Sequence, residues 1–197
     1  MATTAVPIAD EAPELLARNI RVGSRIWAAS QAFFFMAFFF AFLYLRALNT
    51  NGLWRGWPNT HKPHPSLAFG IVIMICVVAG AVVARGATLL PTRTWRVAAA
   101  GAAFLELAAV GLQCAQFSSL GFGPTDGAYA SVFVGWTGLF ALMLFGTIYW
   151  LATVISDFGR AVATPAFREA AVEAVSFVLI VLAGIEFVAF ILLYVVA

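Results

Sequence analysis

The amino-acid sequence predicts an all-α integral membrane bundle of five transmembrane helices, preceded by a short N-terminal interfacial helix. Hydrophobic residues make up 63% of the 197-residue chain and charged residues only 10%, whereas soluble domains are about half apolar and about a quarter charged. The apolar residues also fall into five long runs, each close to the roughly 20 helical residues that cross a bilayer core. A water-soluble protein is therefore excluded, and the 19 Phe and 6 Trp exclude a disordered chain.

Residues 1–25 form the predicted cytoplasmic N-terminal arm, and residues 26–197 form the predicted membrane domain. Within the arm, the segment Glu11–Arg25 places four apolar residues among acids and arginines. This mixture is typical of a short helix that lies on the membrane surface before the first crossing. The acidic residues of the arm also disfavour a cleaved signal peptide.

Five apolar runs follow, and short connections separate all but the first two. The predicted spans are Ile26–Leu45, Leu67–Ala84, Val97–Phe117, Ala128–Ile155 and Val172–Val196. The first contains the sequence FFFMAFFFAFLYL, which is apolar on every side and favours a helix that faces lipid. The sequence has no fixed-period repeat and no long linker, so a single bundle is expected.

Lysine and arginine are distributed unequally between the two sides of this topology. The N-terminal arm and the second and fourth connections carry eight of them, whereas the first connection carries three and the third connection and C-terminus carry none. Basic residues are enriched on the cytoplasmic side of membrane proteins. The count therefore predicts a cytoplasmic N-terminus and, after five crossings, a C-terminus outside.

The first connection, residues 46–66, is the longest and is rich in Trp and Pro. We expect Arg46, Trp54 and Trp57 to form a belt at the depth of the outer lipid headgroups, where such side chains are enriched. The only two histidines, His61 and His64, lie in the same loop.

No membrane span contains histidine, the usual ligand of a buried haem or copper centre. His61 and His64 have no Cys or acidic neighbour to complete a metal site, so a polar loop is the favoured interpretation. The sequence also lacks the GxSxG, Gly-rich phosphate-loop and HExxH motifs. We therefore predict no catalytic, cofactor or metal-ligating residue in this chain, and the scattered basic residues indicate no nucleic-acid partner.

Polar residues inside the spans are costly and need a reason to be there. Glu106 and Gln113 are seven residues apart and share a helix face with Gln116 close by, so this face should point into protein. Glu186 lies in the fifth span. The carboxyl groups fit either a proton or ion relay or, as we favour, neutral acids hydrogen-bonded to a neighbouring helix. Gln31 in the first span is expected to make a similar contact between helices.

The fourth span carries small residues on one face. Ser131, Gly135 and Gly138 follow a spacing that lets two helix backbones approach closely. We therefore expect this face to pack against another helix.

Several short motifs occur in a characteristic order along the chain. Ser30 and Gln31 lead into Phe-Phe-Phe, and Gly56-Trp57-Pro58 follows the first span. The later motifs are Leu112-Gln113, then Asp126-Gly127-Ala128-Tyr129-Ala130-Ser131-Val132-Phe133 with Thr137-Gly138, and finally Arg168-Glu169-Ala170-Ala171. This order, which covers about 170 residues from the first span to the C-terminus, resembles the cytochrome c oxidase subunit III family, in a divergent five-helix bacterial form; the first part is similar to the family's "SE-x-FFF … WP" pattern.

This resemblance implies a multi-pass protein of the bacterial cytoplasmic membrane that is a non-catalytic subunit of a respiratory haem-copper oxidase. Haem and copper would be held by the catalytic partner subunit, other subunits of the complex would be partners too, and bound phospholipid would be compatible with this role. The chain departs from the family pattern where the family has membrane carboxylates, which are Gln31 and Gln116 here. Two family histidines are also replaced within residues 139–143, and the family's HFVD sequence reads Ser-Phe-Val-Leu at 176–179.

Three alternatives stay open at this point. The chain is compatible with an accessory subunit of a nitric oxide reductase, or with an assembly protein that joins such a complex transiently. It is also compatible with a small proton-coupled transporter that uses Glu106 and Glu186, although the paired broken helices typical of transporters are missing from the pattern.

Overall fold

The computed structural model describes residues 13–49, 54, 64–91, 94–157 and 165–196. All the regular secondary structure in these ranges is helical, in the order α1 (Pro13–Ala47), α2 (Leu67–Ala87), α3 (Trp95–Ser119), α4 (Ala128–Asp157), α5 (Pro165–Phe190) and the π-helical segment η2 (Ile191–Val196). All five α-helices are long and apolar enough to cross a membrane. The predicted all-α class and the five candidate membrane spans are therefore confirmed, while Trp57, His61 and residues 1–12 lie outside the described part.

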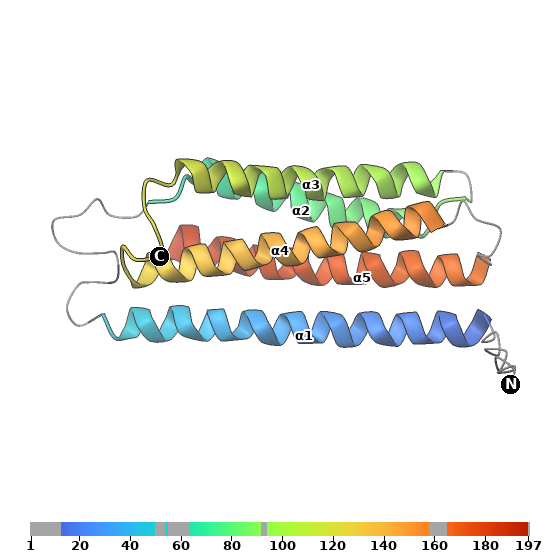
Figure 1. Ribbon diagram of the computed structural model, residues 1–197, viewed down its shortest axis with the longest axis horizontal. Helices are drawn as coiled ribbons and strands as arrows, with labels where there is room; N and C mark the ends of the chain where they lie inside the picture. Colours follow the sequence, from blue (N-terminus) through green and yellow to red (C-terminus); the bar gives the residue numbers. More distant parts are fainter. Residues whose placement is uncertain (1–12, 50–53, 55–63, 92–93, 158–164, 197) are drawn as a thin grey trace, which may run out of the picture.

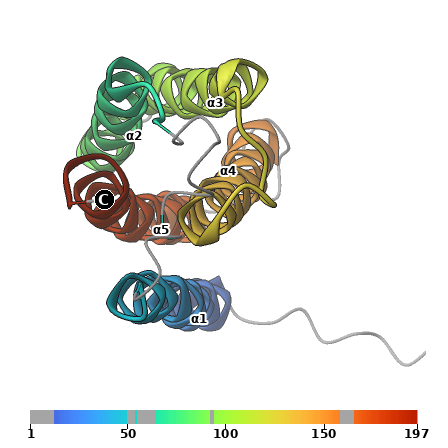
Figure 2. The same cartoon turned by 90° about the vertical axis from the view of Figure 1, so that its left-hand side faces the viewer.

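Four of the helices, α2 to α5, form a bundle, and α1 packs on the outside of it. Helices α2, α3, α4 and α5 contact one another in a closed ring, and α1 packs outside this ring against α5 and α4. Figure 2 shows the ring end-on with α1 on its outer side, and Figure 1 shows that the helices run nearly parallel to one long axis. One side of α1 is therefore left for lipid or for another protein.

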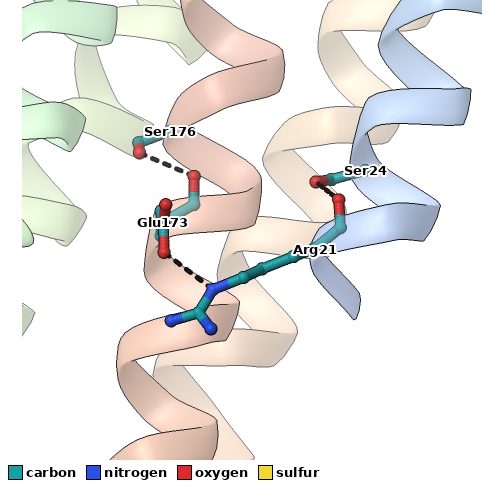
Figure 3. Close-up of polar contacts among 4 residues, drawn as sticks. All are labelled: Arg21, Ser24, Glu173 and Ser176. Atoms are coloured by element: carbon teal, nitrogen blue, oxygen red, sulfur yellow. Dashed lines mark hydrogen bonds and ion pairs between the residues drawn. The ribbon is translucent and has the colours of Figure 1, made fainter. Parts of the chain in front are cut away.

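Helix α1 differs from the expectation of a separate surface helix over Glu11–Arg25. From Pro13 to Ala47 the chain forms one continuous helix of 35 residues. No proline interrupts the helix after its first residue, and Gly23 and Ser24 alone do not break it. The early turns are also joined to the bundle, because Arg21 Nε donates a hydrogen bond of 2.9 Å to Glu173 Oε2 on α5 (Figure 3).

Helices α2 and α3 pack through regularly spaced small residues. On α3 the buried positions are separated alternately by four and three residues: Trp95, Ala99, Ala102, Glu106, Ala109, Gln113 and Gln116. The buried face of α2 follows the same kind of spacing and includes Gly70, Gly80, Ala81, Ala84 and Ala87. Small side chains let helices approach closely in a membrane, and this spacing is that of a coiled-coil contact.

Trp54 differs from the expectation that it faces lipid headgroups. Its side chain is only 5% exposed and makes edge-to-face contacts with Phe42, 5.3 Å between ring centroids, and with Tyr129 at 5.7 Å. Its backbone N–H also donates to Asn49 Oδ1 at 2.9 Å. Trp54 therefore joins α1 to α4 as part of the packed interior. Arg46 is exposed in the last turn of α1, and its contact with lipid headgroups stays a prediction.

Candidate functional site

The candidate site is a set of polar side chains buried between α2, α3 and the C-terminal part of the chain. Helix α3 contributes Glu106, Gln113 and Gln116, which are 0%, 4% and 0% exposed. The seven-residue spacing of the first two places them on one face, and that face points into the bundle. Because a helix rises about 1.5 Å per residue, these side chains extend over about 15 Å of helix length.

Glu106 lies against a glycine of the neighbouring helix. A Cβ atom built on Gly80 of α2 would collide with Oε1 of Glu106 and would lie 2.7 Å from its Cδ. A carbon contact is most favourable at about 3.5–4.0 Å, so no larger residue fits here without movement. Gly80 therefore provides the space that the Glu106 carboxyl occupies.

The Glu106 carboxyl has no hydrogen-bond partner among the described residues. Glu186 of α5, itself 5% exposed, lies within electrostatic range of Glu106. A carboxylate without a cation is very costly in hydrocarbon, so the neutral, protonated form of such a group is the inexpensive one. The cross-helix hydrogen bond expected for Glu106 is therefore not seen among the described residues.

The two glutamines and a tyrosine form a hydrogen-bonded chain. Gln113 Nε2 donates to Gln116 Oε1 at 3.1 Å, and the Tyr194 hydroxyl donates to the same oxygen at 3.0 Å. Tyr194 comes from η2, so this chain links α3 to the C-terminal segment. Glu186 also lies within electrostatic range of Tyr194, so the two acids and the hydrogen-bonded amides are neighbours in one region of the bundle.

Tyr194 is the member of the site that sequence reasoning missed. Its ring lies against Gly70 of α2, where an added Cβ would be 2.8 Å from Cε1 and Cζ of the ring. It also packs on Phe133 and Phe190, with ring centroids 5.6 and 5.5 Å apart. A single tyrosine near the end of an apolar run does not stand out in the sequence as a site residue. The two glycines on the buried face of α2, Gly70 and Gly80, are the sequence feature that indicates where large side chains of other elements pack against this helix.

Gln31 is not part of this site. It is 3% exposed on α1, which lies outside the ring formed by the other helices, and neither its amide nitrogen nor its amide oxygen has a partner among the described residues. Its expected hydrogen bond to another helix is therefore not seen. The structure thus groups Glu106, Gln113, Gln116 and Glu186 together and leaves Gln31 apart from them.

The small residues of α4 differ from the expected backbone-to-backbone contact. Ser131 is exposed, and its hydroxyl hydrogen-bonds to the backbone just before α4 begins, where the Pro124 and Gly127 carbonyls are its acceptors. A Cβ at Gly135 would lie 3.1 Å from Phe38 of α1, and one at Gly138 would lie 3.7 Å from Phe117 of α3. These two glycines therefore face aromatic rings of two different helices. The prediction missed this because the spacing of small residues does not determine which side chain fills the space above a glycine.

Among the described residues, no group of three or more His, Cys, Asp or Glu side chains is arranged to hold a metal ion. The site offers two carboxyls, two amides and one phenol, a set that can hold and pass protons or stabilise helix contacts. No family model matches the sequence, and no curated protein matches it. The function is therefore inferred from the chain's own residues and motifs.

Proposed function

We propose that this chain is a non-catalytic membrane subunit of a respiratory haem-copper oxidase, similar to cytochrome c oxidase subunit III. In this proposal it lies in the bacterial cytoplasmic membrane with its N-terminus in the cytoplasm and its C-terminus outside. A separate catalytic subunit holds the haem and copper for aerobic electron transport. This chain contributes helices that pack against that subunit and stabilise it.

The observation that carries the proposal is that residues of the resemblance motifs lie at contacts between elements. Tyr129, from the Asp-Gly-Ala-Tyr motif, is 2% exposed, and its hydroxyl donates to the Leu193 carbonyl at 2.6 Å, which joins α4 to η2. Ala170 and Ala171, from the motif that opens α5, are 0% and 1% exposed. Motif residues that hold helices together are what a supporting subunit needs.

Helix α1 supplies a surface for a partner. Helix α1 packs on the bundle through one side only. Among its exposed residues are Phe33, Met36 and Phe40, whose side chains are 78%, 60% and 67% exposed. In a membrane this surface contacts either lipid tails or the apolar helices of another subunit. The proposal assigns at least part of it to the catalytic subunit.

The experiment that tests the proposal is purification of the tagged chain from its native membrane in mild detergent, with mass spectrometry and a haem spectrum of the eluate. The proposal predicts that a haem-bearing chain is purified together with this chain at a fixed stoichiometry. Recovery of the chain alone from every mild detergent would contradict it. Oxygen consumption versus nitric oxide consumption by the purified complex distinguishes an oxidase from a nitric oxide reductase, and a substoichiometric yield would indicate an assembly protein.

A second candidate function is a small proton-coupled transporter, favoured by two buried acids near each other, one of which, Glu106, has no hydrogen-bond partner among the described residues. This function predicts a flux into liposomes that depends on a pH gradient and is lost in Glu106→Gln while the fold survives. Gln31→Leu is a suitable control, because Gln31 is equally buried but lies outside the site. An unchanged flux in Glu106→Gln would contradict this function.

A further inference from the structure

The buried polar site extends from the middle of the bundle toward one end only. That end, where α2 begins and α3 and η2 end, is on the left in Figure 1 and is called the η2 end below. Glu106 lies against Gly80 of α2. Tyr194, which donates a hydrogen bond to Gln116, lies against Gly70, ten residues or about 15 Å nearer to the η2 end. Gly70 is the fourth residue of α2 and Gln116 lies three residues before the end of α3, so the polar site comes within about one helical turn of the η2 end.

The opposite half of the bundle is apolar on the facing sides of α2 and α3. Between Glu106 and that end, their buried residues are Ala81, Ala84, Ala87, Trp95, Ala99 and Ala102. Trp95, the first residue of α3, is 2% exposed, and the guanidinium carbons of Arg96 and Arg168 lie 5.8 and 6.0 Å from its ring centroid. Apart from the Trp95 indole N–H, side chains of this kind give water no hydrogen-bond partner. This half, called the Trp95 half below, therefore separates Glu106 from the other end of the bundle.

Two buried hydroxyls also lie in the Trp95 half, on the two remaining helices of the ring. Thr147 of α4 donates its hydroxyl proton to the Met143 carbonyl at 2.9 Å, and Ser176 of α5 donates to the Glu173 carbonyl at 2.9 Å. Each hydroxyl thus uses its one proton within its own helix. Neither of them extends the polar site toward that end.

Three buried polar atoms of the site have no hydrogen-bond partner among the described residues. They are both carboxyl oxygens of Glu106 and Nε2 of Gln116. Buried polar atoms in proteins are nearly always hydrogen-bonded, either to protein or to ordered water, because leaving them without a partner is costly. Glu186 of α5 lies within electrostatic range of both Glu106 and Tyr194. A row of water molecules along the polar site would therefore give all three atoms partners.

The charged and titratable groups around Glu106 are few. The basic residues of the described parts of α2, α3 and α5 all lie in the Trp95 half, and they are Arg85, Arg96 and Arg168. Glu106 makes no ion pair among the described residues. Its titratable neighbours are Glu186 of α5 and, on α2, the half-buried Cys76; on α4, Tyr129 is buried near the η2 end, where its hydroxyl donates to the Leu193 carbonyl. In hydrocarbon the neutral carboxyl is the inexpensive form, so a proton that leaves Glu106 must be replaced along the same path.

We propose that water enters the ring from the η2 end and joins Glu106 to that end past Glu186 and Tyr194, so that Glu106 exchanges its proton with that side of the membrane only. In each exchange the carboxyl gives its proton to the nearest water molecule and receives another proton from the same row, so the charge balances. In the proposed orientation, this side is the outside of the cell. The inference concerns the same acids as the transporter candidate but rests on neither proposed function, because one-sided exchange requires no net transport and no partner subunit.

The first experiment maps water access from each side with silver ions, which react with thiols and reach a buried cysteine only through water. In a Cys76→Ala/Cys114→Ala background, Ala109→Cys places a thiol one turn from Glu106 toward the η2 end, and Ala99→Cys places one on the same buried face in the Trp95 half. The full chain is reconstituted in vesicles of known orientation, silver is added on one side, and the remaining thiols are counted with maleimide after denaturation. We expect Ala109→Cys to react from the η2 side only and Ala99→Cys to react from neither side.

The second experiment follows the proton itself by infrared spectroscopy of the carboxyl C=O band after transfer of the vesicles to D₂O. The band that is lost in Glu106→Gln identifies Glu106, and in the wild type this band should shift as a deuteron replaces the proton. Tyr194→Phe keeps the ring on Gly70 and removes only the hydroxyl. Tyr194→Phe and Gln116→Leu should each slow the exchange about tenfold, because each removes a hydrogen-bond partner from a buried path. The matched control is Gln31→Leu, which removes an equally buried amide outside the ring and should leave the rate unchanged.

Several results would overturn the proposal. Reaction of Ala99→Cys with silver, or reaction of Ala109→Cys from the Trp95 side or from neither side, would exclude one-sided water access. A Glu106 band that does not shift in D₂O, or equal slowing in Gln31→Leu, would exclude the path past Tyr194. Thermal unfolding checks each variant, and Tyr194→Phe decides the outcome if Gln116→Leu does not fold.

The two proposed functions are tested separately on the same material. One-sided exchange without any flux under a pH gradient would contradict the transporter candidate and leave this inference intact. Isolation of the chain without a haem-bearing partner would contradict only the oxidase role.

Discussion

Replacing Gly80 with Leu should push the Glu106 carboxyl from its place and weaken the contact between α2 and α3. The first carbon of the new side chain would lie 2.7 Å from Glu106 Cδ and 3.0 Å from its Cγ, at least about 0.5 Å inside the favourable carbon–carbon distance. Glu106 is fully buried, so its side chain has no open space into which it can rotate.

The magnitude follows from comparison with a second glycine. Overfilling a packed interior costs about 1–3 kcal/mol, while the change from Gly to Leu within a helix gains up to about 1 kcal/mol in helix propensity. Gly111 of α3 has no atom within 4 Å of an added Cβ, so Gly111→Leu receives the propensity gain alone. The difference in unfolding free energy between the two variants should therefore be about 1–3 kcal/mol.

The assay is reversible unfolding in mixed detergent micelles, followed by circular dichroism. The double variant Gly80→Leu/Glu106→Ala adds and removes the same number of heavy atoms at one contact, so it should recover much of the lost stability. Neighbouring residues of this kind show interaction energies of about 0.5–3 kcal/mol. Equal stability of Gly80→Leu and Gly111→Leu, or strict additivity in the double variant, would refute the packing of Glu106 on Gly80.

Three further changes are checked by the same unfolding assay. Tyr194→Phe keeps the ring on Gly70 but loses the hydrogen bond to Gln116, so it should cost about 0.5–1.5 kcal/mol; no loss at all would mean that this bond is not formed. Trp54→Ala should cost about 3–5 kcal/mol because it empties a packed aromatic contact, whereas Trp54→Phe should cost clearly less, and equal small effects would place Trp54 at the lipid surface after all. Arg21→Gln breaks an exposed ion pair and should cost less than about 1 kcal/mol, with the cost shrinking at high salt; a large cost that salt leaves unchanged would argue against this interpretation.

Much of the fold was predictable because hydropathy reports directly on the membrane interior. The second and fourth spans were expected at Leu67–Ala84 and Ala128–Ile155, and the helices run over Leu67–Ala87 and Ala128–Asp157. The fifth helix begins earlier than expected, at Pro165, because a helix can continue past the apolar region through polar residues. The same effect joins the predicted surface helix to the first span in α1.

Parts of the site were predictable and parts were not. The burial of Glu106, Gln113 and Gln116 follows from the spacing of costly polar residues along one helix face. The roles of Gly80 and Tyr194 depend on which residue of another helix lies opposite them, and no pattern within a single segment contains that information. The prediction for Trp54 was wrong for the same reason. A tryptophan in a loop next to a membrane span is typical of a headgroup belt, and the partners that bury it, Phe42 and Tyr129, are distant in sequence.

The most direct test of the central proposal, that this chain supports a haem-bearing partner, is the composition of the complex isolated from native membranes. The expected result is one copy of this chain for each haem-containing catalytic subunit, with all the haem assigned to the partner when the two are separated. A chain that is isolated alone and remains functional, or haem that stays with this chain after separation, would contradict the proposal.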